Sequence, residues 1–180
     1  LKMSFEVGGV TQGNAKLNNL MVKRAMDLLQ PSPGERIADL FCGLGNFTLP
    51  IARSGAQVLG VEGLPDLVNR AKQNAVANHC QGYVDFSVAD LFKVNSSALD
   101  NWCNVDKVLL DPPRAGAHAV IEMLTQARRL HRIVYVSCNP ATFVRDAALL
   151  VGKGYRFKLL GVMNLFSQTA HIESIGCFDR

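Results

Sequence analysis

Short apolar segments alternate with helical segments along most of this 180-residue chain, and this alternation limits the possible folds more than any other feature. A strand followed by a helix, repeated, is typical of a mostly parallel sheet with helices on both faces. No helix is predicted between the last two strands, so we expect an antiparallel strand at the end of the sheet. The predicted strands are 36–41, 57–61, 83–88, 107–111, 132–136, 157–162 and 171–178. The predicted helices are 18–29, 46–53, 65–78, 117–128 and 140–151.

The segment DLFCGLGNFT, residues 39–48, joins a predicted strand to a helix through two glycines. Glycine lets a backbone turn tightly and approach a ligand closely. Glu62 closes the next predicted strand, where a carboxylate can accept hydrogen bonds from both hydroxyls of a ribose. Asp39 stands four residues before the first glycine, and its charge suits a cationic ligand better than a pyrophosphate.

S-adenosylmethionine meets both conditions, because it has a ribose and a cationic sulfonium-amino acid end and carries no phosphate. Thr48 stands where a dinucleotide site would have a third glycine or an alanine. A turn that needs glycine only for its geometry is the alternative. The residues predicted to form this cofactor site are Asp39, Gly43, Gly45 and Glu62.

The stretch VYVSCNPATF, residues 134–143, ends a predicted strand on Cys138. Pro140 is favoured at the first position of a helix, which makes Asn139 the N-cap. A helix N-terminus favours anions and lowers the pKa of a thiol beside it, so we predict that Cys138 is a thiolate nucleophile. A small buried thiol is the alternative. That alternative suits the other cysteines, Cys42, Cys80, Cys103 and Cys177.

Two acidic residues are predicted to lie near Cys138. Asp111 begins DPPRAGA, residues 111–117, a stiff turn after another predicted strand, where a helix-capping Asp is the alternative. Glu173, in TAHIESI, alternates with apolar residues in a segment typical of a strand, where a solvated side chain is the alternative. A thiolate, a base and a methyl donor together suit methylation of a pyrimidine at C5. The thiolate adds to C6, C5 then attacks the methyl group, and the base removes the C5 proton.

Four motifs together resemble the catalytic domain of the RNA uracil-5-methyltransferases. They are DLFCGLGNFTLP, DKVLLDPPRAGA, IVYVSCNPATFVRD and HIES. The similarity runs from about Gln12 to the end of the chain and is nearest to the branch that modifies 23S ribosomal RNA, with the tRNA branch as the alternative. It implies a class I S-adenosylmethionine-dependent methyltransferase fold, an α/β, Rossmann-like, seven-stranded doubly wound sheet with an antiparallel last strand. It also implies that Cys138 is the nucleophile, Glu173 the proton acceptor, and Asp111 a neighbour of the target uracil and the methyl donor.

The same resemblance places a further set of residues at positions that contact S-adenosylmethionine. Gln12 is matched through QGNAKLNNLMVKRA, although Val10 stands where the family usually has Phe. Asp90 replaces an Asn of some relatives, and either side chain could bond the adenine amino group. The set implied by the resemblance is Gln12, Phe41, Asn46, Glu62, Asp90 and Asp111.

The net charge, the cysteines and the apolar runs of the chain indicate which binding partners and which cell compartment suit it. The 19 Lys and Arg exceed the 15 Asp and Glu by four, a mild excess that is compatible with an RNA partner without requiring one. The five cysteines show no CxxC spacing, which favours reduced thiols and a cytoplasmic protein. No run reaches the roughly 18 apolar residues of a membrane span. No protein partner is implied.

We expect residues 1–180 to form a single catalytic domain with an irregular lead-in at 1–13. The opening LKMSFEVGG lacks the profile of a signal peptide and reads as a cut inside a longer chain. Members of the resembled family usually carry an N-terminal RNA-binding β-barrel and, in the ribosomal RNA branch, a cysteine-ligated iron–sulfur cluster. Both are expected only in a segment that this chain lacks.

Three other functions fit parts of this pattern. An amino-methyltransferase can use Asp-Pro-Pro as its amine-binding turn, but it has no use for Cys138 and usually has an aromatic residue where Arg114 stands. A nicotinamide-dependent oxidoreductase is disfavoured by Thr48. A catalytically silent RNA-binding module could keep the fold, but it would not need Cys138 and Glu173.

Overall fold

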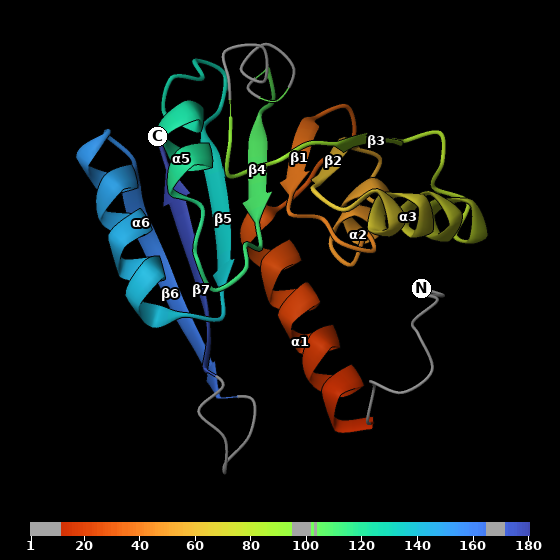
Figure 1. The fold of residues 1–180 in the computed structure, drawn as a ribbon, viewed down its shortest axis with the longest axis horizontal. Coiled ribbons are helices and arrows are strands. Elements are labelled where there is room, and N and C mark those ends of the chain that lie inside the picture. Colours follow the sequence, from red (N-terminus) through yellow and green to blue (C-terminus); the bar gives the residue numbers. More distant parts are fainter. Residues whose placement is uncertain (1–11, 95–101, 103, 165–171) are drawn as a thin grey trace.

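The computed structural model describes residues 12–94, 102, 104–164 and 172–180, and the strands within these ranges form one seven-stranded sheet (Figure 1). The strands are β1 Arg36–Leu40, β2 Gln57–Glu62, β3 Val84–Val88, β4 Lys107–Leu110, β5 Arg132–Ser137, β6 Arg156–Asn164 and β7 Ile172–Asp179. Their order is β3-β2-β1-β4-β5-β7-β6. The chain therefore winds outward from β1 in both directions, which confirms the doubly wound sheet. Ligands bind such sheets at the carboxyl ends of the strands, where the winding reverses.

Helices cover both faces of the sheet, because the side chains of each buried strand alternate between two apolar clusters. Ile37 of β1 belongs to the cluster formed with α1 and α2, whereas Ala38 and Leu40 belong to the cluster formed with α5 and α6. The helices are α1 Gln12–Leu29, α2 Thr48–Ala52, α3 Pro65–Ala77, α5 His118–Leu124 and α6 Pro140–Gly152. Among the described helices, none combines the length and the apolar character needed to cross a bilayer.

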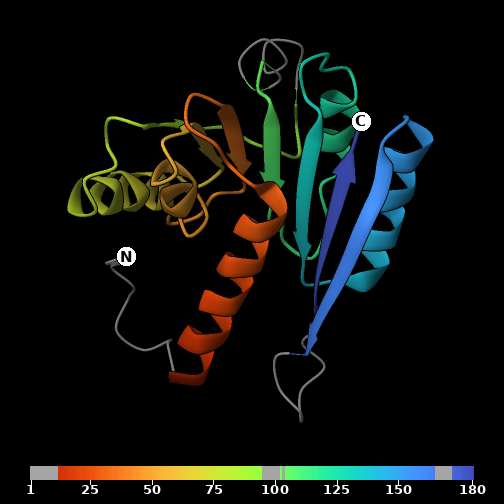
Figure 2. The same cartoon turned by 180° about the vertical axis from the view of Figure 1, so that it is seen from behind.

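Strand β7 runs antiparallel to both of its neighbours, β5 and β6, which confirms the predicted antiparallel strand. Figure 2 shows its arrow pointing opposite to theirs. An antiparallel strand presents its first residues at the edge where parallel strands present their last. Ser137 at the end of β5 pairs with Ser174 near the start of β7. Cys138 directly follows Ser137 and Glu173 directly precedes Ser174, so both lie just beyond this pair, and the charge of Glu173 acts on the Cys138 thiol.

Two predicted helices differ from the structure by more than two residues at one end, and the other three by one or two residues. Helix α1 begins at Gln12 rather than at residue 18. Helix α5 ends at Leu124 rather than at residue 128, because the hydroxyl of Thr125 donates to the backbone oxygen of Glu122 at 2.8 Å and the next residues form a tighter turn. Ala127 and Leu130 are still buried beyond the helix, which explains why the apolar spacing suggested more helix.

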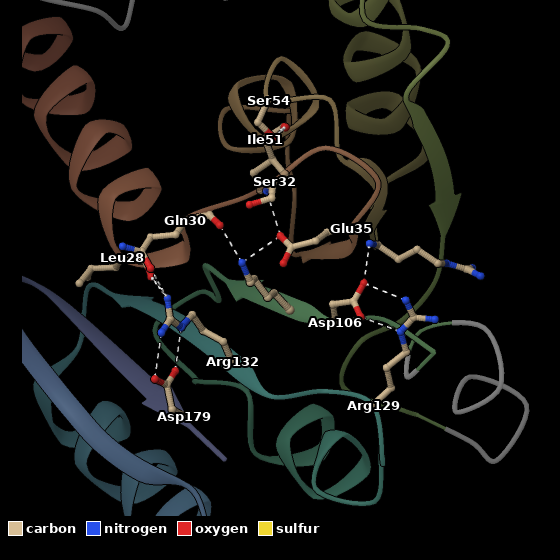
Figure 3. Close-up of polar contacts among 12 residues, drawn as sticks. Leu28, Gln30, Ser32, Glu35, Ile51, Ser54, Asp106, Arg129, Arg132 and Asp179 are labelled. Carbon is tan, nitrogen blue, oxygen red and sulfur yellow. Dashed lines mark hydrogen bonds and ion pairs between the residues drawn. The ribbon is translucent and has the colours of Figure 1, made fainter.

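Charged side chains at the amino-terminal ends of the parallel strands connect the sheet to the end of α1 (Figure 3). Arg132 binds the carboxylate of Asp179 through two nitrogens, at 2.7 and 2.9 Å, and also donates to the backbone oxygen of Leu28. Lys107, which is buried, pairs with Glu35 at 2.9 Å and donates to the backbone oxygen of Gln30. These contacts fasten α1 to β4 and β5 at the edge opposite the predicted site.

Replacing Glu35 with alanine is expected to lower the free energy of unfolding by about 3 kcal/mol, because it leaves the buried ammonium of Lys107 without its counter-charge. Urea unfolding followed by circular dichroism measures the change. Replacing the exposed Glu122 with alanine is the matched control and should change the free energy by less than about 0.5 kcal/mol. Equal losses in the two variants would contradict a stabilising role for this pair.

Candidate active site

The carboxyl ends of β1, β2, β4 and β5 meet at one edge of the sheet, the lower edge in Figure 1. The glycine turn follows β1 at this edge. Gly43 and Gly45 have φ angles of +54° and +88°, so the left-handed backbone here favours glycine. A Cβ added to Gly43 would meet nothing within 4 Å, so open space remains beside this residue. The prediction of a tight turn between strand and helix is confirmed.

The carboxylate of Glu62, at the end of β2, holds the glycine turn in place. Its Oε2 accepts a hydrogen bond from the backbone N–H of Gly43 at 3.1 Å. Its Oε1 accepts from the N–H groups of Gly63 at 2.8 Å and Leu64 at 3.1 Å. A carboxylate oxygen has two acceptor positions, so Oε2 can still accept a hydroxyl. The residue predicted to bind a ribose therefore also shapes the loop beside it.

Asp39 lies fully buried at the end of β1, under the glycine turn. Its Oδ2 accepts a hydrogen bond of 2.5 Å from the hydroxyl of Thr48. Its Oδ1 is the one buried side-chain polar atom without a hydrogen-bond partner in the described part of the chain. Burial, assisted by the charge of Glu62 and opposed by the bonds from Thr48, raises the pKa of Asp39 to about 7. Thr48, which stands where a dinucleotide site would have a small residue, thus holds the carboxylate of Asp39 in place.

Three other residues predicted to contact the cofactor lie around the same turn. Phe41 is half-buried with φ +66°, and its ring lies 5.6 Å from that of Phe92, measured between centroids. Asn46 exchanges two hydrogen bonds with Asn18 of α1, at 2.8 and 2.9 Å, and so joins the helix to the turn. Asp90 is exposed and accepts from the backbone N–H of Phe92 at 2.9 Å. Asp90 therefore already caps a turn of its own.

Gln12, also predicted to contact the cofactor, is the first residue of α1. Its side chain lies outside the described part of the structure. Cys103, predicted to be a buried thiol, is also outside the described residues. The cysteines that the structure describes are free, and those predicted to be buried are buried: Cys42, Cys80 and Cys177.

Cys138 follows β5 directly and precedes α6, as predicted. Asn139 is the N-cap of α6 and accepts a hydrogen bond from the N–H of Ala141 at 3.1 Å, and Pro140 is the first helical residue. The hydroxyl of Ser137 donates to the backbone oxygen of Asn139 at 3.0 Å and closes the turn around the cysteine. Cys138 is half-buried, so its thiol remains accessible.

The charges around Cys138 overturn one prediction. Burial, the negative charges of Glu173 and Asp111, and the opposing charge of Arg114 together raise the pKa of the Cys138 thiol above its ordinary value. The prediction that the helix N-terminus lowers this pKa is therefore wrong, because burial and two carboxylates outweigh the helix end. These interactions also show that the three residues predicted to do the chemistry share one small region.

Asp111 follows β4 directly and is half-buried beside β1, where its N–H donates to the backbone oxygen of Leu40 at 3.4 Å. Burial, together with the charges of Asp39 and Glu173, raises the pKa of Asp111 to about 7. Asp111 thus lies between the glycine turn and the cysteine. It connects the predicted cofactor residues to the predicted catalytic pair.

The turn 111–117 and the turn around Cys138 are joined by side chains. The Nδ2 of Asn139 donates to the backbone oxygen of Arg114 at 2.9 Å, and the hydroxyl of Thr142 donates to the same oxygen at 3.3 Å. Sequence reasoning identified Asn139 only as a helix cap and missed this second contact. It also missed the buried Asp146 of α6, which touches the same turn. Within the motif IVYVSCNPATFVRD, the final Arg145 and Asp146 are the residues that make that contact.

Comparison with known proteins extends this description. The family model described as tRNA (Uracil-5-)-methyltransferase matches residues 2–179. Among similar curated proteins, the 23S rRNA (uracil(1939)-C(5))-methyltransferase RlmD of Neisseria lactamica is 50% identical over 179 residues, which are 99% of this chain and 40% of that protein. The enzyme of the same name from Azoarcus sp. is 53% identical over 179 residues, covering 99% and 41%. The chain spans about two fifths of the length of the curated relatives it matches.

Solved structures agree with this comparison. The tRNA (uracil-54, C5)-methyltransferase of Pyrococcus abyssi, in complex with S-adenosyl-L-homocysteine, is 30% identical with a TM-score of 0.78, covering 95% of this chain and 40% of that chain. The magnesium protoporphyrin IX methyltransferase of Synechocystis shares the fold alone, with 21% identity and a TM-score of 0.70 over 96% of this chain and 86% of that chain. The family match covers nearly the whole chain, so this protein belongs to the tRNA (uracil-5-)-methyltransferase family.

Proposed function

We propose that this chain is the catalytic domain of a longer enzyme that transfers a methyl group from S-adenosylmethionine to C5 of a uridine in RNA. The observation that carries the proposal is the register of β5 and β7, which ends with Ser137 opposite Ser174 and so brings Cys138 and Glu173 to the end of the sheet where Asp111 also lies. A nucleophile, a base and a second carboxylate at this end of the sheet suit this chemistry. Membership in the family supports the same reaction.

The residues at the glycine turn suit S-adenosylmethionine. Asp39 is a buried carboxyl group and Asp111 a half-buried one, both of which favour a cationic ligand, and the Oδ1 of Asp39 has a free acceptor position. Glu62 keeps one acceptor position for a ribose hydroxyl. When bound, S-adenosylmethionine supplies an electrophilic methyl group on a positively charged sulfur. A positive charge at this edge offsets the carboxylates that raise the pKa of Cys138, and so favours its thiolate.

The chain's own residues can then perform the remaining steps. The Sγ of Cys138 bonds to C6 of the uracil ring, and the electron pair of the C5–C6 double bond passes to the C4 carbonyl as an enolate. The enolate electron pair at C5 then bonds to the methyl carbon as the bond between that carbon and the donor sulfur breaks, and the sulfur leaves as a neutral thioether. Glu173 takes the C5 proton, the C5–C6 double bond re-forms, and the Sγ–C6 bond breaks to release the thiolate. Asp111, between the two groups of residues, holds the ring and the donor beside each other.

The substrate we propose is 23S ribosomal RNA, with tRNA as the second candidate. The ribosomal RNA relatives are 50% and 53% identical to this chain, whereas the tRNA enzyme of known structure is 30% identical. A uridine in folded RNA must leave its stack to reach a half-buried thiol, so a flipped base is part of the proposal. The free cysteines of the described residues suit the cytoplasm.

Mass spectrometry of the full-length protein with RNA containing 5-fluorouridine tests the proposal. Fluorine at C5 cannot leave as a proton does, so the reaction is expected to stop as a covalent protein–RNA species with one added methyl group. Peptide mapping should place the bond on Cys138. A protein that binds S-adenosylmethionine and RNA but never forms this species would be a silent module or would methylate a different atom.

Replacing Glu62 with alanine is expected to weaken binding of S-adenosylhomocysteine by about 1–3 kcal/mol, because a charge-assisted acceptor and the clamp on Gly43 are both lost. Isothermal titration calorimetry measures the affinity. The exposed Asp66 of α3 provides the matched control, and its alanine variant should bind as the unmodified protein does. Unchanged affinity in the Glu62 variant would mean that the ligand binds elsewhere.

A further inference from the structure

The turn that follows Asp111 is fastened to α6 by one buried carboxylate, that of Asp146. Its Oδ2 accepts hydrogen bonds from the backbone N–H of Ala117 at 2.7 Å and from the hydroxyl of Tyr135 at 2.8 Å. Its Oδ1 forms an ion pair with Arg145 at 2.7 Å. Arg145 in turn donates to the backbone oxygen of Ala115 at 3.0 Å. Both residues of this pair therefore hold the backbone of the same turn.

The backbone of the turn lies directly against this pair. Gly116 has a φ of +80°, and a Cβ added to it would lie 2.6 Å from the Nη2 of Arg145 and 2.6 Å from the Oδ2 of Asp146. No side chain fits between the turn and the two charged groups. The DPPRAGA motif therefore needs glycine at this position, because the turn must approach a carboxylate closely.

Asp146 has no exposed surface, and burying a carboxylate is costly unless its hydrogen bonds are satisfied. Three donors come from three places: the turn, strand β5 and the neighbouring Arg145. The buried hydroxyl of Tyr135 donates to the carboxylate, and both burial and this bond raise the pKa of the tyrosine. An apolar side chain would fill the same space without this cost, so the carboxylate serves to fix the backbone around it.

The middle of the turn, at Arg114, is fastened to the same helix. Asn139, the N-cap of α6, and Thr142, in its first turn, both donate to the backbone oxygen of Arg114. Cys138 lies two residues before the start of that helix. The segment that carries Asp111 and Arg114 and the segment that carries Cys138 are thus attached to one rigid element at two points.

We propose that Asp146 is a positioning residue, which holds Asp111 and Arg114 at a fixed place relative to the sulfur of Cys138. The proposal rests on the proposed function, because it assumes that these three residues act on one substrate. Asp146 does not touch the substrate. Its effect is on the alignment of the reacting groups, so its loss should lower the rate of the chemical step more than the affinity for RNA.

The test uses the full-length enzyme with substrate RNA and S-adenosylmethionine. The Asp146→Asn variant replaces one acceptor oxygen by an amide donor, which cannot pair with the donors around it. We expect kcat to fall about 100-fold, with KM for RNA changed by less than about threefold, because small misplacements of reacting groups have effects of this size. Tyr135→Phe is the matched control. It removes a buried bond to the same carboxylate while the contacts to the turn remain, so its kcat should stay within about twofold of the unmodified enzyme.

A second variant keeps the proposal testable if Asp146→Asn does not fold. Arg145→Gln loses the ion pair and the bond to Ala115 at a partly exposed position, and a loss of about tenfold in kcat is expected. Wild-type kcat in a folded Asp146→Asn or Arg145→Gln enzyme would overturn the positioning role. An increase in KM for RNA as large as the decrease in kcat would overturn it too, because it would point to lost binding rather than to lost alignment. An unmodified enzyme that methylates no uridine would instead refute the proposed function.

Discussion

Replacing Cys138 with alanine in the full-length enzyme is expected to abolish both methylation and adduct formation, because no group remains to add to C6 of the uracil. Replacing Glu173 with glutamine is expected to have a different result. The thiolate still adds and the methyl group is still transferred, but the C5 proton stays and the Sγ–C6 bond cannot break. A protein–RNA species with one added methyl group should therefore survive a denaturing gel for Glu173→Gln alone.

Two matched variants separate these results from damage to the fold. Cys80→Ala removes a buried thiol between α3 and β3, and β3 is four strands away from β5 in the sheet. Glu122→Gln removes an exposed carboxylate, so both variants should methylate RNA normally. Normal turnover by Glu173→Gln would mean that another base acts, and Asp111 at the same edge would be the next to test. Methylation by Cys138→Ala would show that the cysteine is only a thiol before a helix.

The free energy of unfolding is expected to decrease as the pH rises from 5 to 8. Asp39 and Asp111 have pKa values of about 7 in the folded chain, against an ordinary value of 3.8. Between these values the folded chain keeps protons that the unfolded chain has released, so this stability is complete below pH 3.8 and is lost as the pH rises through 7. Each group should account for about 3 kcal/mol between pH 5 and pH 8.

Urea unfolding at several pH values measures this decrease. Asp39→Asn and Asp111→Asn should each flatten the curve, whereas Asp66→Asn, at an exposed position of α3, should leave it unchanged. The two carboxyl groups interact and should titrate as a pair. The double variant is therefore expected to reduce the pH dependence of the free energy of unfolding by less than the sum of the two single reductions. If both single variants lose as much stability with pH as the unmodified protein, the two carboxyl groups are already ionised at pH 5.

Local sequence patterns predicted the parts of the structure that depend on neighbouring residues. Pro140 directly after Asn139 predicted the start of α6 to the residue, and the glycines predicted the turn after β1. The end of α5 was missed because Ala127 keeps helical apolar spacing, although it is buried by a turn rather than by a helix. The spacing of apolar residues in the sequence does not distinguish a helix from a turn that buries the same residues.

The properties that failed or were missed depend on residues distant in the chain. The pKa of Cys138 is raised partly by Glu173, 35 residues away, and by Asp111, 27 residues away, so the local view of a helix N-terminus was incomplete. Asp146 looks like an ordinary polar residue of a helix. It becomes a buried anchor only because Gly116 and Tyr135 pack against it from other elements.

The place of β7 in the sheet also has a consequence for how the chain folds. β7 follows β6 in sequence, yet it lies between β5 and β6. Until it inserts, β5 keeps an open edge of unpaired backbone groups along an apolar strand, which is a template for pairing between molecules and for aggregation. The insertion that closes this edge is the same event that sets Glu173 beside Cys138. A molecule whose β5 edge is still open to aggregation therefore cannot yet have its nucleophile paired with its base.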